Sequence, residues 1–301
     1  MNNLILLLLC FIAGMLLHRF RRLPENAHVA LNGFIIHVSL PALTLLYIHS
    51  LKINADVVLM AAMAWIYFVL AAGFFWLAGR WLNWPRSTTG AMMMMGGLGN
   101  TSFFGLPMIE AYYGHAQVVT GIIVDQLGSF LVLSTFGITV AGLYSSGRPA
   151  AAEIMKRIVL FPPFIALALA LLLIPVNYPD WLVSVLQRLG NTLAPLALLS
   201  VGFQLRLGHI AGNARNLAIG LGFKLLLAPL LLFLLYVPLL GAHGEAIQVT
   251  LFESAMPPMI AAAIVATEHD LDPPLVTLMV AVGLLVSFFT LSGWWWALRG
   301  I

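Results

Sequence analysis

Charged residues are scarce in this chain. Asp, Glu, Lys and Arg together make up 8% of its 301 residues, whereas a soluble globular protein carries about 25%. So few charges cannot cover a surface that faces water, and 61% of the residues are hydrophobic. The composition therefore excludes a soluble globular protein and predicts an integral membrane protein in a lipid bilayer. The formal net charge of +3 is too small and too scattered for a nucleic-acid partner.

The motifs of common catalytic and metal sites are also missing. The sequence has no G-x-S-x-G, no H-E-x-x-H and no glycine-rich phosphate loop. Its eight histidines show no helical zinc-ligand spacing, and Cys10, the single cysteine, cannot form an intrachain disulfide. We therefore expect no cofactor, no metal and no enzyme activity. A membrane-embedded hydrolase is the least favoured alternative.

Apolar stretches that could cross a bilayer are abundant. A helix needs about 20 apolar residues to span the hydrocarbon core, and short loops with turn residues separate the candidates. We count ten, at approximately 3–20, 28–50, 56–79, 87–112, 117–144, 157–176, 181–205, 213–237, 245–267 and 274–298. The first is expected to be a retained span, because its charges follow the apolar run, whereas those of a signal peptide precede it.

Basic residues are distributed unevenly among the loops. Cytoplasmic loops carry an excess of Lys and Arg. With the N-terminus outside, the cytoplasmic loops hold Arg19, Arg21, Arg22, Arg80, Arg86, Arg148, Lys156, Arg157, Arg206 and Arg215. The outer side receives Lys52 and Arg299. We therefore predict that both termini face the outside of the cell.

The two halves of the chain resemble each other. The segment that begins at Pro41 reads like the one at Pro195, at an offset of 154, and an offset of 156 aligns Thr101 with Pro257. Five spans is an odd number, so the second copy would be inverted in the membrane, as in secondary transporters with a site at the repeat interface. The predicted domains are a first five-helix repeat (1–144), a short cytoplasmic linker (145–156) and a second, inverted repeat (157–301).

Helix-breaking residues interrupt the fourth and ninth spans. Gly99 and Pro107 weaken the fourth, and Pro257 and Pro258 weaken the ninth. A broken helix frees backbone polar groups that lipid cannot satisfy, so it survives only inside protein or beside a cavity. Paired breaks in the two halves indicate the binding site of a carrier. The competing interpretation is a pair of kinks that only ease packing.

Polar residues beside the fourth-span break predict the kind of ligand. The N-terminal end of a half-helix presents unpaired N–H groups and a partial positive charge. Asn100 adds an amide, and Thr101 and Ser102 add hydroxyls. These groups suit a carboxylate. With Met256 and Pro257 at the matching break, they form the predicted substrate site.

A few residues place charge or an amide inside the predicted spans: Asp125, Gln126, Lys224 and Glu253. A charge at a helix centre costs about 2.5–3.5 kcal/mol on insertion scales, so these side chains should face the bundle or pair with one another. Asp125, Gln126 or Glu253 could hold a proton or a cation, and Lys224 could neutralise a carboxylate. A purely structural buried pair is the alternative.

The fourth span resembles a known motif. The auxin efflux carrier family, which includes plant PIN carriers and bacterial malonate-type permeases, has a fourth-helix motif similar to Asn100-Thr101-x-x-x-Gly105-x-Pro107-x-x-x-Ala111-x-Tyr113-Gly114. Two further stretches, Ser39-Leu40-Pro41 and Ala255-Met256-Pro257, resemble the family's second helix and second crossover. The likeness covers essentially the whole chain.

This resemblance implies an all-α integral membrane fold of the bile-acid-symporter or NhaA type. Ten helices would form two inverted repeats whose broken helices 4 and 9 cross between a scaffold part and a transport part. Carboxylate substrates would bind at Asn100, in the inner (plasma) membrane of a bacterium. The segment 145–156 is short, so the regulatory loop of many plant carriers is absent.

The predicted function is secondary active transport of a small organic anion by alternating access. A sodium-coupled symporter of the bile-acid class is the nearer alternative, with Asn100, Gln126 and Glu253 as sodium ligands. The sequence leaves open which anion moves, the direction of transport, the coupling ion (proton or sodium) and a homodimeric assembly.

Overall fold

The computed structural model of the protein describes residues 2–48, 55–145, 159–160, 162–174, 176–204 and 210–301. Within these ranges the chain is helical and has no strand. The predicted linker 145–156 falls outside them except for its first residue. The elements are α1 Asn2–Arg19, α2 Ala27–Phe34, η1 Ile35–Ser39, α3 Leu40–Ile48, α4 Ala55–Trp81, α5 Arg86–Gly97, η2 Thr101–Gly105, α6 Leu106–Tyr113, η3 His115–Gln117, α7 Val118–Ile123, η4 Val124–Ser129, α8 Phe130–Val132, η5 Leu133–Gly137, α9 Ile138–Tyr144, α11 Pro162–Leu172, α12 Asp180–Gly190, α13 Leu193–Gln204, α14 Ile210–Gly222, η6 Phe223–Leu227, α15 Ala228–Leu234, η7 Leu235–Leu239, α16 Glu245–Ser254, α17 Ile260–Glu268 and α18 Pro273–Leu298.

Six helical stretches in the described part of the chain are long and apolar enough to cross a membrane. They are Ala27–Ile48, Val57–Trp81, His115–Tyr144, Asp180–Gln204, Gly212–Leu239 and Pro273–Leu298. The remaining predicted spans correspond to shorter or divided helices: α1, α11, the pair α5 and η2–α6, and the pair α16 and α17. The protein is therefore an all-helical membrane protein, and its described residues include six clear apolar helices.

Three prolines follow π-helical turns. Pro41, Pro107 and Pro229 are each the second residue of an α-helix, and η1, η2 and η6 directly precede these helices. A proline inside a helix lacks an N–H and crowds the carbonyl four residues earlier, and a wider π turn accommodates it. Pro107, predicted as part of the fourth-span break, therefore lies in a continuous helical stretch. The break itself is upstream, at residues 98–100.

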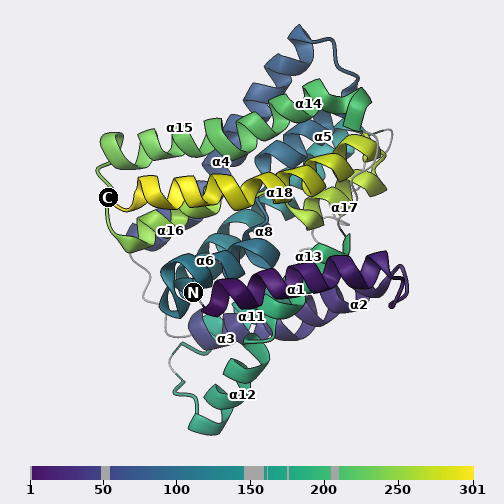
Figure 1. Cartoon of the computed structure of the whole chain (residues 1–301). Coiled ribbons are helices and arrows are strands. Elements are labelled where there is room, and N and C mark those ends of the chain that lie inside the picture. The colour runs from purple at the N-terminus through teal and green to yellow at the C-terminus, as the bar shows by residue number, and fades with distance from the viewer. Residues whose placement is uncertain (1, 49–54, 146–158, 161, 175, 205–209) are drawn as a thin grey trace.

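The helices gather into two bodies (Figure 1). The first, which we call the scaffold body, contains α1–α3 and α11–α13: α1 packs along α13, and both α11 and α12 pack along α3. The second, the core body, contains α4–α9 and α14–α18. In it, α4 packs on both α5 and α16, while α18 packs on both α14 and α17. The labels N and C lie on the same side of the molecule in Figure 1.

Two glycines allow α1 and α13 to approach closely. A Cβ atom at Gly14 would overlap the backbone carbonyl oxygen of Leu199, and one at Gly202 would overlap that of Phe11. Small residues of this kind let membrane helices bring their backbones together, where dispersion contacts hold them without a hydrophobic driving force. The scaffold body therefore depends on both positions lacking a side chain.

We expect Gly202→Ala to lower the free energy of unfolding by about 1–3 kcal/mol, the usual cost of forcing extra atoms into a packed contact. Thermal unfolding of the purified protein in detergent measures this effect. Gly73→Ala in α4 is the matched control, because Gly73 is exposed and an added Cβ there meets no atom within 4 Å. Equal melting temperatures for the two variants would contradict the role given to Gly202.

Candidate substrate and coupling site

Two helices of the core body are interrupted in the interior of the protein. Helix α5 ends at Gly97, Leu98 adopts an extended conformation (φ −120°, ψ 120°), and the helix resumes at Thr101. Helix α16 ends at Ser254, and the chain becomes helical again at Ile260. Gly99, Pro257 and Pro258 all lie in these two non-helical stretches.

The two interrupted stretches cross and bond to each other. The amide of Asn100 donates to the carbonyl of Pro257 at 2.8 Å, and the amide of Met259 donates to the carbonyl of Leu98 at 3.0 Å. Gly99 and Pro258 face each other between these bonds as an antiparallel bridge. Because this central pair exchanges no hydrogen bond of its own, a proline without an N–H is tolerated there. The pairing satisfies backbone groups that the breaks would leave bare in lipid.

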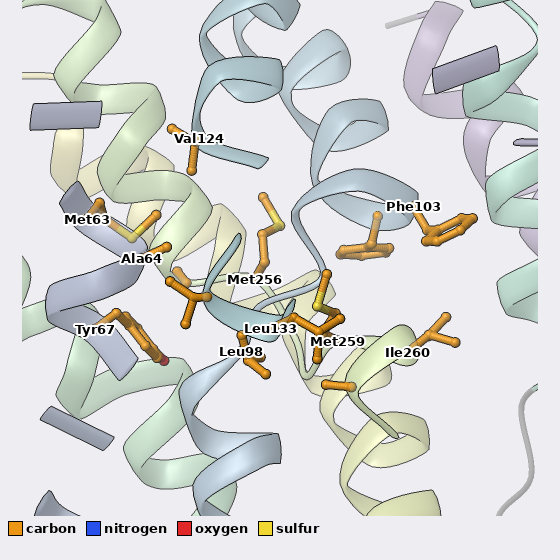
Figure 2. Packing of buried hydrophobic residues seen from close by; sticks show 14 of the residues in the cluster. Met63, Ala64, Tyr67, Leu98, Phe103, Val124, Leu133, Met256, Met259 and Ile260 are labelled. Atoms are coloured by element: carbon orange, nitrogen blue, oxygen red, sulfur yellow. The ribbon is translucent and has the colours of Figure 1, made fainter. Parts of the chain in front are cut away.

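Apolar side chains hold the crossing from both sides (Figure 2). Leu98, Met256 and Met259 lie at its centre, with Met63 and Tyr67 of α4 on one side and Phe103 and Ile260 on the other. All belong to one cluster of buried residues. Met256, predicted to bind substrate, is therefore part of the packed core, and its neighbour Met259 borders the cavity described below.

Asp125 of η4 is buried beside the start of η2. One carboxylate oxygen, Oδ1, accepts hydrogen bonds from the hydroxyls of Thr101 and Ser102, each at 2.7 Å, and Oδ2 accepts one from the Gln126 amide at 2.8 Å. These three hydrogen bonds offset part of the cost of burying the carboxylate. The hydroxyl protons of Thr101 and Ser102, expected from the sequence to face a substrate, are directed at Asp125 in this conformation.

The side-chain amide of Asn100, at the crossing, is buried and makes no hydrogen bond within the described ranges. Its side chain is 1% accessible to solvent, yet neither Nδ2 nor Oδ1 has a hydrogen-bond partner among the described residues. Buried amides are almost always bonded, so an unpaired one requires an explanation. The amide lines neither of the two cavities described below, so a ligand could bond to it only after the crossing opens.

A cavity of about 210 Å³ lies between the scaffold and core bodies beside Asp125. Its wall carries few polar groups among many apolar ones, and the lining residues are Ile36, Leu40, Ser102, Phe103, Asp125, Gln126, Phe130, Leu133, Ser134, Ile138, Met259, Ala261 and Val265. Sequence reasoning found Ser102, Asp125 and Gln126 but missed the apolar wall and Ser134. Apolar residues in a membrane protein carry no local signal that separates a cavity wall from packing.

Glu253, in the last turn of α16, has no partner for either carboxylate oxygen within the described ranges. Two glycines make room for the carboxylate: a Cβ at Gly105 would lie 2.6 Å from Oε2, and one at Gly121 would lie 3.3 Å from Oε1. The carboxylate is thus buried deep in the protein without a hydrogen-bond donor among the described residues, and the Lys224 side chain lines the same small cavity.

Lys224 of η6 lies near the same crossing. Its ammonium donates to the Tyr67 hydroxyl at 2.9 Å and to the Ser254 carbonyl at 3.4 Å, and it lies 4.0 Å from the centre of the Tyr67 ring. Tyr67 in turn donates to the backbone carbonyl of Lys224 at 2.9 Å. Sequence reasoning singled out Lys224 but missed Tyr67, since a tyrosine in an apolar span gives no sign of its partner.

The fold and its buried polar centre define a multi-pass membrane protein. Residues 1–295 match the model of a family described as membrane transport protein, and the chain belongs to that family. This match confirms the resemblance to the auxin efflux carriers.

Two relatives are themselves described only as uncharacterized transporters. The one from Methanothermobacter thermautotrophicus is 28% identical over 297 residues, which cover 95% of this chain and 94% of the relative. The one from Methanocaldococcus jannaschii is 24% identical over 312 residues, which cover 99% and 98%. The family and these relatives are membrane transporters and not enzymes.

Proposed function

We propose that the protein is a secondary active transporter that moves a small organic anion, a carboxylate, across the bacterial inner membrane by alternating access. The unpaired, buried amide of Asn100 at the crossing carries this proposal. The helical stretch η2–α6 starts beside it, where the Thr101 N–H donates to the Gly99 carbonyl and the next N–H groups have no acceptor within the helix. Together they offer donors and a partial positive charge to a carboxylate.

Ten spans in two inverted five-helix repeats form the framework of this proposal. Two reciprocal packings support it: α1 lies along α13, and α11 lies along α3, so that the first helix of each half packs on the second helix of the other. The hydroxyls of Ser39 and Thr192 hydrogen-bond at 2.8 Å, and these residues are 153 positions apart. This spacing is within one residue of the offset of 154 that relates Pro41 to Pro195, as expected for nearly equivalent residues that meet at a two-fold axis.

The cavity of about 210 Å³ is the proposed place of substrate entry. Ile36 and Leu40 line it from the scaffold body, while Ser102 and Met259 line it from the core body. A substrate bound at this seam would become accessible from one side or the other as the two bodies move against each other.

Asp125 and Glu253 are the buried carboxyl groups among the described residues, and we assign the coupling proton to Glu253. Asp125 accepts three hydrogen bonds, whereas Glu253 accepts none within the described ranges. A charged, unpaired carboxylate inside a membrane costs several kcal/mol, and a proton removes that cost. Loading and releasing this proton would link transport to the pH gradient.

Counterflow in proteoliposomes tests the proposed function. Vesicles preloaded with unlabelled dicarboxylates or monocarboxylates are expected to accumulate the labelled anion, and an inward proton gradient should change its net movement. Stimulation by a sodium gradient alone would favour the sodium-coupled symporter of the bile-acid class. Failure of every small carboxylate to exchange, with protein that is folded and inserted, would overturn the proposal.

We expect both termini to face the outside of the cell, because the Lys and Arg residues are concentrated in the odd-numbered loops. In a Cys10→Ser background, cysteines introduced at Asn2 and Gly300 should react with an impermeant maleimide in intact cells. Asn83→Cys, between α4 and α5, is the control that should stay protected until the cells are opened. Protection of both termini would reverse the predicted orientation, and labelling of only one terminus would contradict an even number of spans and with it the inverted repeat.

A further inference from the structure

The surroundings of the Lys224 ammonium have the composition of a cation site. Its ligands are the Tyr67 hydroxyl and the carbonyl of Ser254, which is the last residue of α16. The carbonyls at the end of a helix carry a partial negative charge. Broken helices in carriers commonly use such carbonyls to hold sodium or a proton.

A cavity of about 10 Å³, close to the size of one small ion or water, adjoins the ammonium. Oxygen-bearing residues from four elements line it together with Lys224: Tyr67, Thr101, Ser129, Glu253 and Ser254. Each of these side chains is at least 98% buried. Oxygen ligands in a small, dry space suit a hard monovalent cation.

Two acidic side chains near this position also favour a positively charged group there. Asp125 of η4 and Glu253 of α16 are acidic side chains at the crossing. The face of the Tyr67 ring, in α4, lies against the ammonium in a cation–π contact. An added Cβ at Gly99 would lie 3.3 Å from Nζ, so the broken backbone itself approaches the ammonium. Lys224 supplies this charge from its own side chain, where other carriers would need a dissolved ion.

We propose that the Lys224 ammonium occupies a monovalent-cation site at the crossing, so that the protein needs no sodium and loss of this side chain creates a sodium site. The proposal rests on the proposed function for its meaning in transport. It separates the proton-coupled carrier from the sodium-coupled one, because a tethered cation cannot be exchanged with the medium.

Cation binding by the purified protein tests this proposal without any substrate. Thermal unfolding is measured in NaCl and in choline chloride at equal ionic strength. We expect one melting temperature for the wild type in both salts. Lys224→Ala should show a saturable rise of about 5 °C in sodium, the size expected when the ion is present at about 100 times its Kd.

Two further variants make the test specific. Lys224→Met removes the charge but fills the space, so it should show no sodium effect. Glu253→Gln in the Lys224→Ala background should lose the effect, because it removes the nearby carboxylate. If folded Lys224→Ala is recovered only in sodium, that result supports the site directly. If neither salt yields folded Lys224→Ala, the same measurement is made on Lys224→Ser.

A saturable stabilisation of the wild type by sodium would overturn the proposal, as would a folded Lys224→Ala whose melting temperature is the same in both salts. These outcomes do not depend on anion transport. A sodium effect confined to Lys224→Ala would support the cation site even if no carboxylate were transported, in which case the proposed function alone would fall.

Discussion

Asn100→Ala is expected to weaken substrate binding by about 10- to 150-fold. A hydrogen bond to a charged group contributes about 1.5–3 kcal/mol, and each 1.4 kcal/mol is a factor of ten in affinity. The amide of Asn100 is buried and has no partner among the described residues. A bound carboxylate would therefore supply the partner that the protein lacks.

Asn100 suits an anion that must bind and then leave. An amide donates a hydrogen bond without carrying a full charge, whereas a lysine at the same place would have to be desolvated in an apolar site. Folding should survive the substitution, because the backbone amide that bonds to Pro257 is retained and an unsatisfied polar group is removed.

Ligand-induced thermal shift or scintillation proximity with the transported carboxylate measures the affinity. Asn26→Ala is the matched control, since Asn26 is exposed and makes no side-chain cap at the start of α2. Asn100→Asp should be weaker still, because it replaces a donor by a negative charge of nearly the same shape. Unchanged affinity in folded Asn100→Ala would place the substrate away from this crossing.

Glu253→Gln is expected to abolish proton-driven accumulation while leaving anion exchange at equal pH measurable. A glutamine has almost the size of glutamic acid but cannot release or take up a proton at physiological pH. The carboxylate is surrounded by Gly105, Gly121 and the backbone, so an isosteric amide fits without displacing a neighbour. Uptake driven by a pH step, compared with exchange in the same vesicles, separates the two effects.

Asp125→Asn is the companion variant. Asp125 accepts three hydrogen bonds, and an amide in its place would set an NH₂ group against at least one of those donors. We expect a lower transport rate with the pH dependence retained. If both variants kept the rate and the pH dependence of the wild type, these carboxyl groups would be structural and the coupling proton would lie elsewhere.

Local chemistry decided which parts of the site could be predicted. Gly99, Pro257 and Pro258 are residues whose effect on a helix is local, and they lie in the two non-helical stretches. Asn100 and Asp125 were found because polar groups stand out in an apolar sequence. Pro107 was misjudged as part of the break, because a π-helical turn can accommodate a proline without ending the helix.

Long-range partners could not be predicted. Thr101 and Ser102 point their hydroxyls at Asp125, more than twenty residues away, and Tyr67 reaches Lys224 across 157 residues. Such pairs depend on how helices pack, which hydropathy does not encode. The same holds for Met256 and Met259, since only the packed structure shows which methionine is enclosed and which borders the cavity.

The two backbone hydrogen bonds between the interrupted helices hold these helices in a fixed position relative to each other. Each interrupted stretch donates one backbone hydrogen bond to the other and accepts one from it. Neither stretch can therefore slide along the other without breaking both bonds in an environment that offers no water. The conformational change of a transport cycle must then leave the crossing intact and take place in a part of the protein that is easier to deform. Among the described residues no backbone hydrogen bond crosses the seam between the scaffold and core bodies, so shear there breaks only side-chain contacts such as the 2.7 Å hydrogen bond between Tyr47 and His115. The substrate would then move together with a rigid core body, and the thickness of the bilayer would limit how far that body can move.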